Sequence, residues 1–309
     1  MNIDETITNR IAWQLEAGII PWRQTWARGL PRSLPFGREY RGVNILILGS
    51  ADFTSRYWIS YHDVLRLEAK IRKGQRPTPV VFWKWHTPDE LAKRRQQAGM
   101  EPVSAGTPFT GAVFNLDQVK GIQRPKDDVP IRPCKQLFTA DQVYDVMPDK
   151  PSVLHMRADA GDYNPNADHV IMPHLSQFDS AQEYYATLFH QLAHATGHRK
   201  RLSRFGTVKG DRFDPHSFEE LVAELGAAFL CGFAGIPNPP LDRLQECQIS
   251  GWAKALRDDP RMVMRAASAA QKAADYIRGK LPSELAAPAS RSPRQAIASS
   301  GTAAQAALF

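Results

Sequence analysis

The stretch YYATLFHQLAHATGH, residues 184–198, constrains the chain more than any other. Its apolar residues recur at helical spacing, which predicts a helix over 177–196 with one buried side. His190 and His194 are four residues apart, so they lie on one face of that helix and can bind a single cation with two imidazoles. Gly197 follows directly and is typical of a helix end. The segment therefore predicts a helix that carries two metal ligands.

A second apolar helix, SFEELVAELGAAFLCG at 217–232, offers acidic candidates for a third ligand. Glu220 and Glu224 are four residues apart, and a carboxylate that faces a core is costly unless it is paired or bound to metal. We expect Glu220 to complete a His₂Glu site and Glu224 to accept a hydrogen bond from a ligand histidine. The reverse assignment stays open, as does an ordinary helix with solvated glutamates. His198 is a rival ligand, although Gly197 is expected to turn the chain away.

The residue after the first histidine departs from the H-E-x-x-H pattern of zinc peptidases, because Gln191 stands where the glutamate would be. That glutamate takes a proton from water and returns it to the leaving amine. Glutamine has nearly the same shape but cannot accept the proton, so Gln191 occupies the catalytic position without its chemistry. Metal binding should survive, since this residue is not a ligand. Tyr163 and His169 are candidates to line the cleft.

The charge of the chain is concentrated in its first part. Up to residue 133 there are 20 Lys and Arg against 13 Asp and Glu, and the remainder has 19 of each. Six of the seven tryptophans lie in the same part. Aromatic rings that stack on bases, with cations that follow phosphates, are typical of single-stranded nucleic-acid binding with little sequence preference. Core packing of the tryptophans is the alternative. The candidate DNA-binding residues are Trp22, Arg23, Trp26, Arg28, Arg38, Tyr40, Arg41, Lys73, Arg76, Trp83, Lys84 and Trp85.

Periodicity predicts an α+β protein with a mixed front part and a mainly helical second part. The expected helices are 3–17, 43–50, 60–73, 139–147, 177–196, 216–232 and 245–280, the last broken near Pro260, and the expected strands are 78–85, 111–119 and 168–173. Residues 89–99 read as a charged helix or loop. We expect domains at 1–123 and 139–281, a proline-rich linker at 124–138 and a disordered tail at 282–309.

The rest of the composition argues against a disulfide-stabilised protein, a cysteine-zinc protein and a membrane-spanning protein. Three widely spaced cysteines argue against a disulfide framework and a cysteine-zinc site, and they favour a reducing cytoplasm. No segment approaches the apolar run of about 18 residues that a membrane span needs. We therefore expect a cytoplasmic protein without a membrane partner.

The front part resembles the N-terminal single-stranded-DNA-binding domain of ArdC-type antirestriction proteins, which is also found in TraC plasmid primases. The similar stretches are LEAGIIPWRQTW, GREYRGVNILIL, YWISYHDVLRLEAKIRKGQRP and AVFNLDQVKG. The rear part is similar to the zincin-like metallopeptidase domain of ArdC through YNPNADHVIMPHLSQF, YYATLFHQLAHATGH, SFEELVAELGAAFLCG and AAQKAADYI. The resemblance covers residues 3–280 in the family's order.

This resemblance implies a protein of conjugative, plasmid-type systems that coats incoming single-stranded DNA and protects it from host restriction. The family's metal motif carries onto His190, His194 and Glu220, with zinc as the first expectation and manganese as an alternative. A protein substrate or host restriction component is implied but not identified. Because of Gln191, we expect an impaired peptidase. The alternatives are an active peptidase with DNA as its tether and a DNA-coating protein on an inert zincin scaffold.

Overall fold

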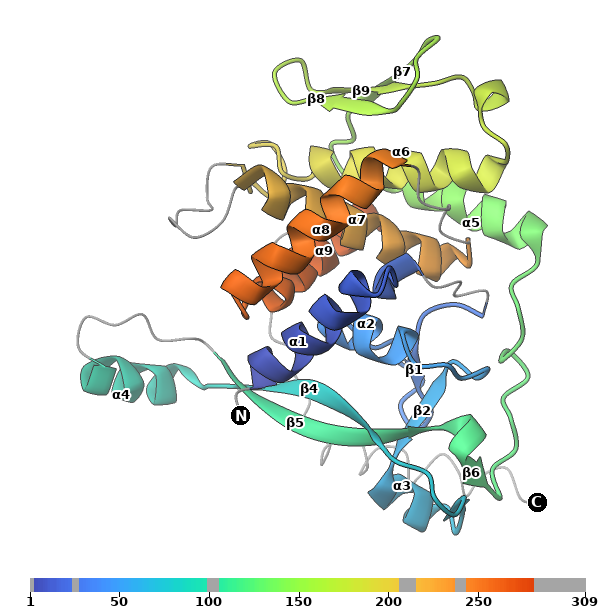
Figure 1. The fold of residues 1–309 in the computed structure, drawn as a ribbon, viewed down its shortest axis with the longest axis vertical. Helices are drawn as coiled ribbons and strands as arrows, with labels where there is room; N and C mark the ends of the chain where they lie inside the picture. The colour runs from blue at the N-terminus through green and yellow to red at the C-terminus, as the bar shows by residue number, and fades with distance from the viewer. Residues whose placement is uncertain (1–2, 24–27, 99–105, 206–214, 237–242, 281–309) are drawn as a thin grey trace.

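The helices from α5 (Pro133–Asp145) onward form the centre of the fold, with a long β ribbon on one side and a small sheet on the other (Figure 1). The computed structural model describes residues 3–23, 28–98, 106–205, 215–236 and 243–280. The central helices are α5 (Pro133–Asp145), α6 (Ala181–Ala195), α7 (Pro215–Ala234), α8 (Arg243–Asp258) and α9 (Met262–Ile277). The predicted break near Pro260 is confirmed, since proline interrupts the helical hydrogen bonds between α8 and α9.

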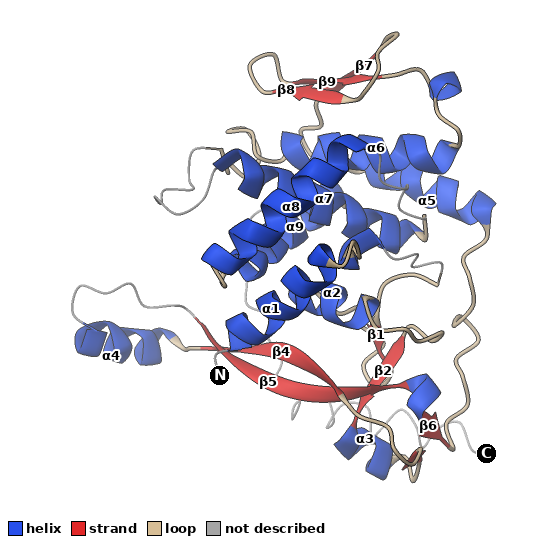
Figure 2. Cartoon of the chain, in the orientation of Figure 1, coloured by secondary structure: helices blue, strands red, loops and turns tan. Residues whose placement is uncertain are grey.

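The front part contains short helices around a four-stranded sheet with the order β1-β2-β5-β4. Its helices are α1 (Ile3–Glu16), α2 (Val43–Gly49), α3 (Tyr61–Arg66) and α4 (Pro88–Ala98). Its strands are β1 (Arg32–Ser33), β2 (Tyr57–Ser60), β4 (Thr78–Trp85) and β5 (Gly106–Asn115), with β3 (Lys70–Ile71) and β6 (Val119–Lys120) as a separate pair. β4 pairs antiparallel with β5 over its whole length, and the two strands form the ribbon below the helices (Figure 2).

A third sheet covers the outer side of α6, with β9 (His169–Met172) between β7 (Ser152–His155) and β8 (Asp162–Asn164). The sequence predicted β9 but not its two neighbours, because β8 has only three residues and the two apolar residues of β7, Val153 and Leu154, are adjacent and show no alternation. The alternation of β9 is clear: Val170 and Met172 are fully buried, while His169 and Ile171 are only half-buried. This alternation places one face of the sheet against the helical core.

The hydrophobic core is continuous between the front and rear parts of the chain. Ile11 and Leu15 of α1 belong to the same buried cluster as Phe189 of α6. Trp22 is fully buried and meets Trp252 of α8 edge-on, with ring centroids 5.8 Å apart. The front helices are therefore part of the packing that holds the metal-site helices in place.

The expected helix at 60–73 is wrong in its second half. α3 ends at Arg66, and Glu68 adopts a left-handed φ of 53°, which a helix cannot continue through. The chain then enters β3, which pairs with β6. The charged stretch at 89–99 is a helix, α4, and α5 begins at Pro133, where proline suits the first turn. The expected tail at 282–309 lies outside the described residues.

Candidate functional site

α6 and α7 pack side by side and bring the predicted ligands together. Leu188 and Leu192 are buried on one side of α6, which leaves the histidines on the side that faces α7. α6 starts with the Ser180 hydroxyl accepting a hydrogen bond from the Glu183 amide. After the helix, the chain folds back closely at Gly197, where a Cβ atom would lie 2.5 Å from the ring of Phe205. Only glycine fits at that position without rearrangement.

The cluster itself consists of His190, His194 and Glu220, whose ligand atoms all lie within 4.8 Å of one another. The Nε2 atoms of the two histidines are 3.1 Å apart, and the carboxylate of Glu220 lies 3.3 Å from Nε2 of His194 and 3.7 Å from Nε2 of His190. Ligands at about 2.0–2.1 Å from a tetrahedral ion are separated by about 3.3 Å. Two nitrogens and a carboxylate that converge on one point therefore fit a divalent cation.

A carboxylate also faces the opposite nitrogen of each histidine. Nδ1 of His190 lies 3.4 Å from Glu224, and Nδ1 of His194 lies 3.5 Å from Glu219. This arrangement directs Nε2 of each ring toward the cluster and makes it a better ligand. The sequence analysis assigned Glu224 to this kind of contact but did not identify Glu219. The doublet Glu219-Glu220 was the available signal, since consecutive helical residues point about 100° apart and can serve two different rings.

Glu219 is in turn fixed by Arg204, which lies in the loop after α6. Nε of Arg204 donates to Glu219 at 2.7 Å, and its Nη2 donates to the carbonyl of Ala193 at 2.9 Å. The Arg204 side chain is 9% exposed, so the pair is largely desolvated. Arg204 therefore connects the end of α6 to α7 directly beside the histidines.

The pKa values reflect this concentration of carboxylates. Burial alone would lower the pKa of His194, but hydrogen bonds with Glu219 and Glu220 raise it to about 9. Burial opposes ionisation of Glu220 as well, yet its contacts with His194 and His190 bring its pKa below the usual value. The cluster thus favours a positive charge at its centre, which a proton or a metal ion can supply.

Gln191 is buried on the adjacent face of α6, and its Nε2 atom donates a hydrogen bond to the carbonyl oxygen of Gly161 at 3.1 Å. Gly161 immediately precedes β8, and a Cβ atom there would lie 3.2 Å from Cγ of Gln191. The backbone thus comes close to the side chain, and its carbonyl requires a donor. An amide satisfies this requirement, whereas an ionised carboxylate does not.

The other histidine and tyrosine candidates lie elsewhere. His198 is buried, with Nδ1 accepting from the Lys200 amide at 3.3 Å and lying 3.8 Å from Asp168. Tyr163 donates to Asp168 at 2.9 Å and accepts from Arg201 at 3.1 Å. Both belong to a structural network around Asp168 that joins β9 to the chain after α6. His169 is half-buried on β9.

The candidate DNA-binding residues fall into three groups. Arg38, Lys73, Arg76, Trp83 and Lys84 are exposed. The side chains of Arg23, Trp26 and Trp85 lie outside the described part of the structure. The remaining four are partly or wholly engaged elsewhere, although Arg41 is also 54% exposed: Trp22, Arg28, Tyr40 and Arg41.

Within the engaged group, Trp22 is corrected from a stacking residue to a core residue, because its ring is fully buried against Trp252. Arg28 donates to the carbonyl of Asp128, and Arg41 pairs with the buried carboxylate of Asp275 on α9. Burial raises the pKa of Tyr40 to about 12. These side chains contribute to folding, which the periodicity of a proline-rich loop could not reveal.

The β4–β5 ribbon exposes aromatic rings that the sequence analysis did not select. Phe82 and Phe109 lie opposite each other in the register, with ring centroids 5.6 Å apart, and are 39% and 51% exposed. Trp83 is the next residue on β4, so it projects from the other face of the ribbon, and it is 44% exposed. Large exposed rings on both faces of a two-stranded ribbon are unusual, and this part of the chain also carries excess positive charge.

In the part of the chain that the structure describes, no helix has both the length and the apolar character that crossing a bilayer requires.

Two family profiles match this chain. The profile for the N-terminal domain of anti-restriction factor ArdC matches residues 1–114, and the profile for a zincin-like metallopeptidase matches residues 124–269. Curated relatives include a DNA primase TraC of Escherichia coli, 30% identical over 88% of this chain. This chain spans only 27% of that primase, and 20% of a second TraC primase at the same identity. The uncharacterized protein y4eC of Sinorhizobium fredii is 32% identical, with 89% of this chain and 91% of y4eC covered.

Solved structures give the same result. The Mn(II)-bound crystal structure of the antirestriction ArdC protein from the R388 plasmid has a TM-score of 0.70 and 29% identity, covering 93% of this chain and 99% of that one. Its metal-free structure has a TM-score of 0.69 and 30% identity, covering 90% and 97%. The fold with its clustered histidines and glutamate, the two profiles in this order and the nearly full-length relatives together show that this chain belongs to the ArdC family of antirestriction proteins.

Proposed function

We propose that this protein binds single-stranded DNA largely without sequence specificity and thereby protects incoming, conjugatively transferred DNA from restriction in the host cytoplasm. The observation that carries the proposal is the β4–β5 ribbon, where Phe82, Trp83 and Phe109 are exposed. Exposed rings of this size cost free energy in water unless a partner covers them. Bases have apolar faces that stack on such rings, and stacking is tolerant of sequence.

Basic side chains near the ribbon support a nucleic-acid partner over an apolar one. Lys84 follows Trp83 on β4, and Lys73 and Arg76 lie in the turn that leads into the strand. All three are exposed, as phosphate-binding cations need to be. In this proposal, residues 1–123 hold most of the DNA contacts, residues 139–281 hold the metal site, and residues 124–138 join the two parts, although the last six of them already belong to α5.

We further propose that His190, His194 and Glu220 hold one divalent ion, with zinc first and manganese as the alternative. Both ions bind imidazole and carboxylate ligands, but a site with two imidazole nitrogens binds zinc more tightly than manganese. An ion in this site would act as a Lewis acid. Glu224 and Glu219 would keep the imidazole rings oriented, because each faces the nitrogen that points away from the cluster.

The same site lacks the group that peptide hydrolysis needs. Gln191 is neutral, and its amide is engaged with the carbonyl of Gly161, so it neither accepts nor returns a proton. We therefore propose that this chain is an impaired metallopeptidase. The intact ligand cluster with both outer carboxylates supports a metal site over an inert scaffold, because carboxylates on both sides of the two imidazoles favour a positive charge at their centre. Gln191 argues against the alternative of an active peptidase tethered to DNA.

The test is fluorescence anisotropy with labelled oligothymidine of about 16 nucleotides, a mixed-sequence single strand and a matched duplex. We expect both single strands to bind with similar affinity and the duplex to bind more weakly. Raising the salt concentration from about 50 to about 200 mM should weaken binding at least tenfold. Equal affinity for the duplex, or no response to salt, would show that stacking and phosphate contacts are not the basis of binding.

A further inference from the structure

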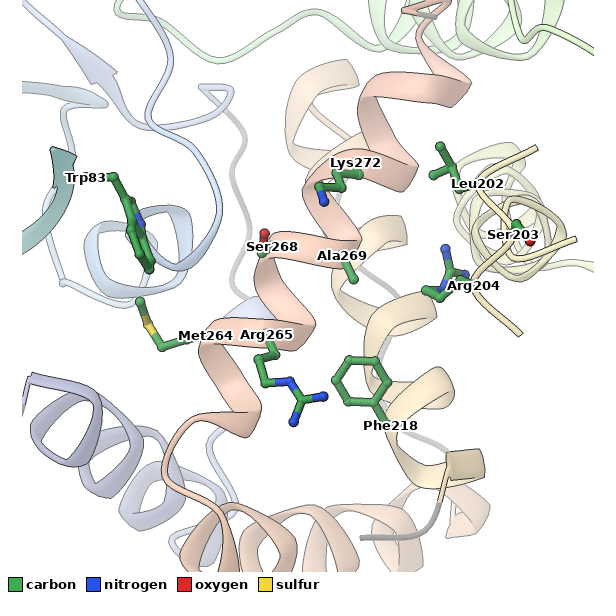
Figure 3. A pocket seen from close by; sticks show the side chains of 10 residues that line it. All are labelled: Trp83, Leu202, Ser203, Arg204, Phe218, Met264, Arg265, Ser268, Ala269 and Lys272. Atoms are coloured by element: carbon green, nitrogen blue, oxygen red, sulfur yellow. The ribbon is translucent and has the colours of Figure 1, made fainter. Parts of the chain in front are cut away.

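A cavity of about 480 Å³ lies between the β ribbon and the helical part (Figure 3). One wall is Trp83 of β4, and another is α9, which contributes Met264, Arg265 and Lys272. The third wall is formed by Phe218 of α7 with the loop after α6. The cavity therefore connects the proposed DNA-binding surface with the elements that surround the metal cluster. Its volume is in the range of small-ligand sites, about 300–1,000 Å³.

The cavity has a distinct chemical character. Trp83 offers an aromatic face that is 44% exposed, and Figure 3 shows it to one side of α9, with Arg204 and Phe218 on the other side of that helix. Arg204, Arg265 and Lys272 contribute cations, and no acidic residue is among the described residues that line the space. An aromatic ring and several cations without a lining carboxylate suit a ligand with a flat apolar part and a negative charge.

The three cations differ in how much charge they can offer. Arg204 is paired with Glu219 at 2.7 Å, so its charge is already balanced. Arg265 lies 3.8 Å from Asp259 and 5.9 Å from the ring of Phe218, and it stays half exposed. Lys272 is exposed on α9 and forms no ion pair with any carboxylate in the described ranges. The cations that are least engaged with carboxylates therefore lie along α9, the helix that Figure 3 shows between Trp83 and Phe218.

We propose that this cavity binds one nucleotide of the single-stranded DNA, with the base against Trp83 and the phosphate beside Lys272 and Arg265. The inference rests on the proposed function and deepens it, because it extends the DNA path from the ribbon onto α9 of the zincin part. Strand continuity requires phosphates on both sides of a stacked base, and Lys272 and Arg265 of α9 supply cations for one of them. An acidic peptide could form ion pairs with the cations, but it has no base to stack on the ring of Trp83.

Two variants on α9 test the cavity without altering the ribbon. Lys272→Gln removes the cation, and its matched control, Lys254→Gln, removes an exposed cation from α8. Ser268→Phe fills the cavity from an exposed position, so it should not disturb the core. The measurement is anisotropy with oligothymidine of about 16 nucleotides across a salt series.

We expect Lys272→Gln to reduce the slope of log affinity against log salt by about 1, and Ser268→Phe to weaken binding by about tenfold. Lys254→Gln should behave as the unmodified protein. If the unmodified protein binds single strands and both cavity variants match it in affinity and slope, the cavity proposal is overturned while the proposed function stands. If the unmodified protein does not prefer single strands, the two proposals fail together. Circular dichroism of each variant establishes that it is folded.

Discussion

The side-chain amide of Gln191 donates a hydrogen bond to the carbonyl oxygen of Gly161 across 3.1 Å. This contact joins the metal-site helix to the chain just before β8. It also shows that glutamine at this position has a local structural role, since a carboxylate would place two acceptors against each other. The residue that departs from the peptidase pattern is thus matched to its surroundings.

Gln191→Glu tests two expectations: that glutamine at this position stabilises the fold, and that the missing carboxylate limits peptide cleavage. Without metal, the variant should be less stable by about 1 to 3 kcal/mol, because a buried carboxylate replaces a satisfied amide and leaves the Gly161 carbonyl without its donor. With zinc or manganese, the new carboxylate can act as a general base, so cleavage of fluorescently labelled casein should rise by about 10²- to 10⁴-fold. Thermal unfolding and a cleavage assay measure the two effects.

The double variant Gln191→Glu/His190→Ala is the control for that gain, because it keeps the base but loses a proposed ligand. Cleavage that persists in the double variant would indicate a contaminating peptidase. Equal cleavage by Gln191→Glu and the unmodified protein would contradict the proposal that the missing base limits this site.

Removal of the ligands should abolish metal binding. We expect the His190→Ala/His194→Ala variant to retain no stoichiometric zinc or manganese after dialysis, since one carboxylate alone cannot hold the ion. The matched control is His62→Ala, at an exposed histidine on α3. Elemental analysis measures the bound metal, and the melting temperature with and without metal gives a second readout, because a ligand that binds only the folded state stabilises it. Equal metal content in the double variant and the control would contradict the site.

Glu219→Gln should weaken metal binding without removing a ligand. The carboxylate lies 3.5 Å from Nδ1 of His194, and the loss of such an outer partner costs about 10- to 100-fold in affinity. Isothermal titration calorimetry with zinc and with manganese measures the change. Glu224→Gln should have a similar effect through His190, whereas Glu5→Gln, at an exposed position of α1, should have none. Unchanged affinity in both outer variants would show that the carboxylates serve packing alone.

Much of the helical part could be predicted from the sequence because its signals are local. The four-residue spacing of His190 and His194 determines a shared face, and the apolar run around Glu220 requires a buried helix. The site details that were missed depend on contacts between segments far apart. Arg204 reaches Glu219 only because the loop after α6 folds back at Gly197, and no spacing along the chain encodes that return.

The front part was harder to predict, since its composition is compatible with two environments. Trp22 and Trp83 both occur in basic, aromatic stretches, yet one is buried in the core and the other is 44% exposed. The difference arises from α8, which covers Trp22 through Trp252, whereas Trp83 lies on the ribbon and lines an open space beside α9. Composition predicts that aromatic rings are present but not which of them another element covers.

The network around Asp168 predicts a specific pH dependence of stability. Burial alone would raise the pKa of Asp168, but hydrogen bonds from Arg201 and Tyr163 lower it to about 2, against about 4 in an unfolded chain. A lowered folded-state pKa means that the stabilisation is present above about pH 4 and is lost as the pH falls toward 2. Asp168→Asn should therefore reduce the unfolding free energy at neutral pH by about 3 kcal/mol or less, since Arg201 keeps other acceptors.

Urea unfolding of both proteins between about pH 7 and pH 2 measures the difference in stability. The difference in unfolding free energy between the unmodified protein and Asp168→Asn should become smaller as the pH falls, because protonation of Asp168 removes the same charge that the substitution removes. A gap that is constant with pH would mean that the ion pair with Arg201 does not account for the effect.

Phe109→Ala and Trp22→Phe should separate DNA binding from folding. Phe109 is 51% exposed on the ribbon, so its loss should cost little stability but weaken binding of oligothymidine by about five- to tenfold, at the low end for one stacked base. Trp22 is fully buried, so Trp22→Phe should leave a cavity and lower the melting temperature while the folded variant binds DNA normally. Anisotropy and thermal unfolding on both variants measure the two effects. Weakened DNA binding in folded Trp22→Phe, with normal binding by Phe109→Ala, would contradict both the ribbon as the stacking surface and the purely structural role of Trp22.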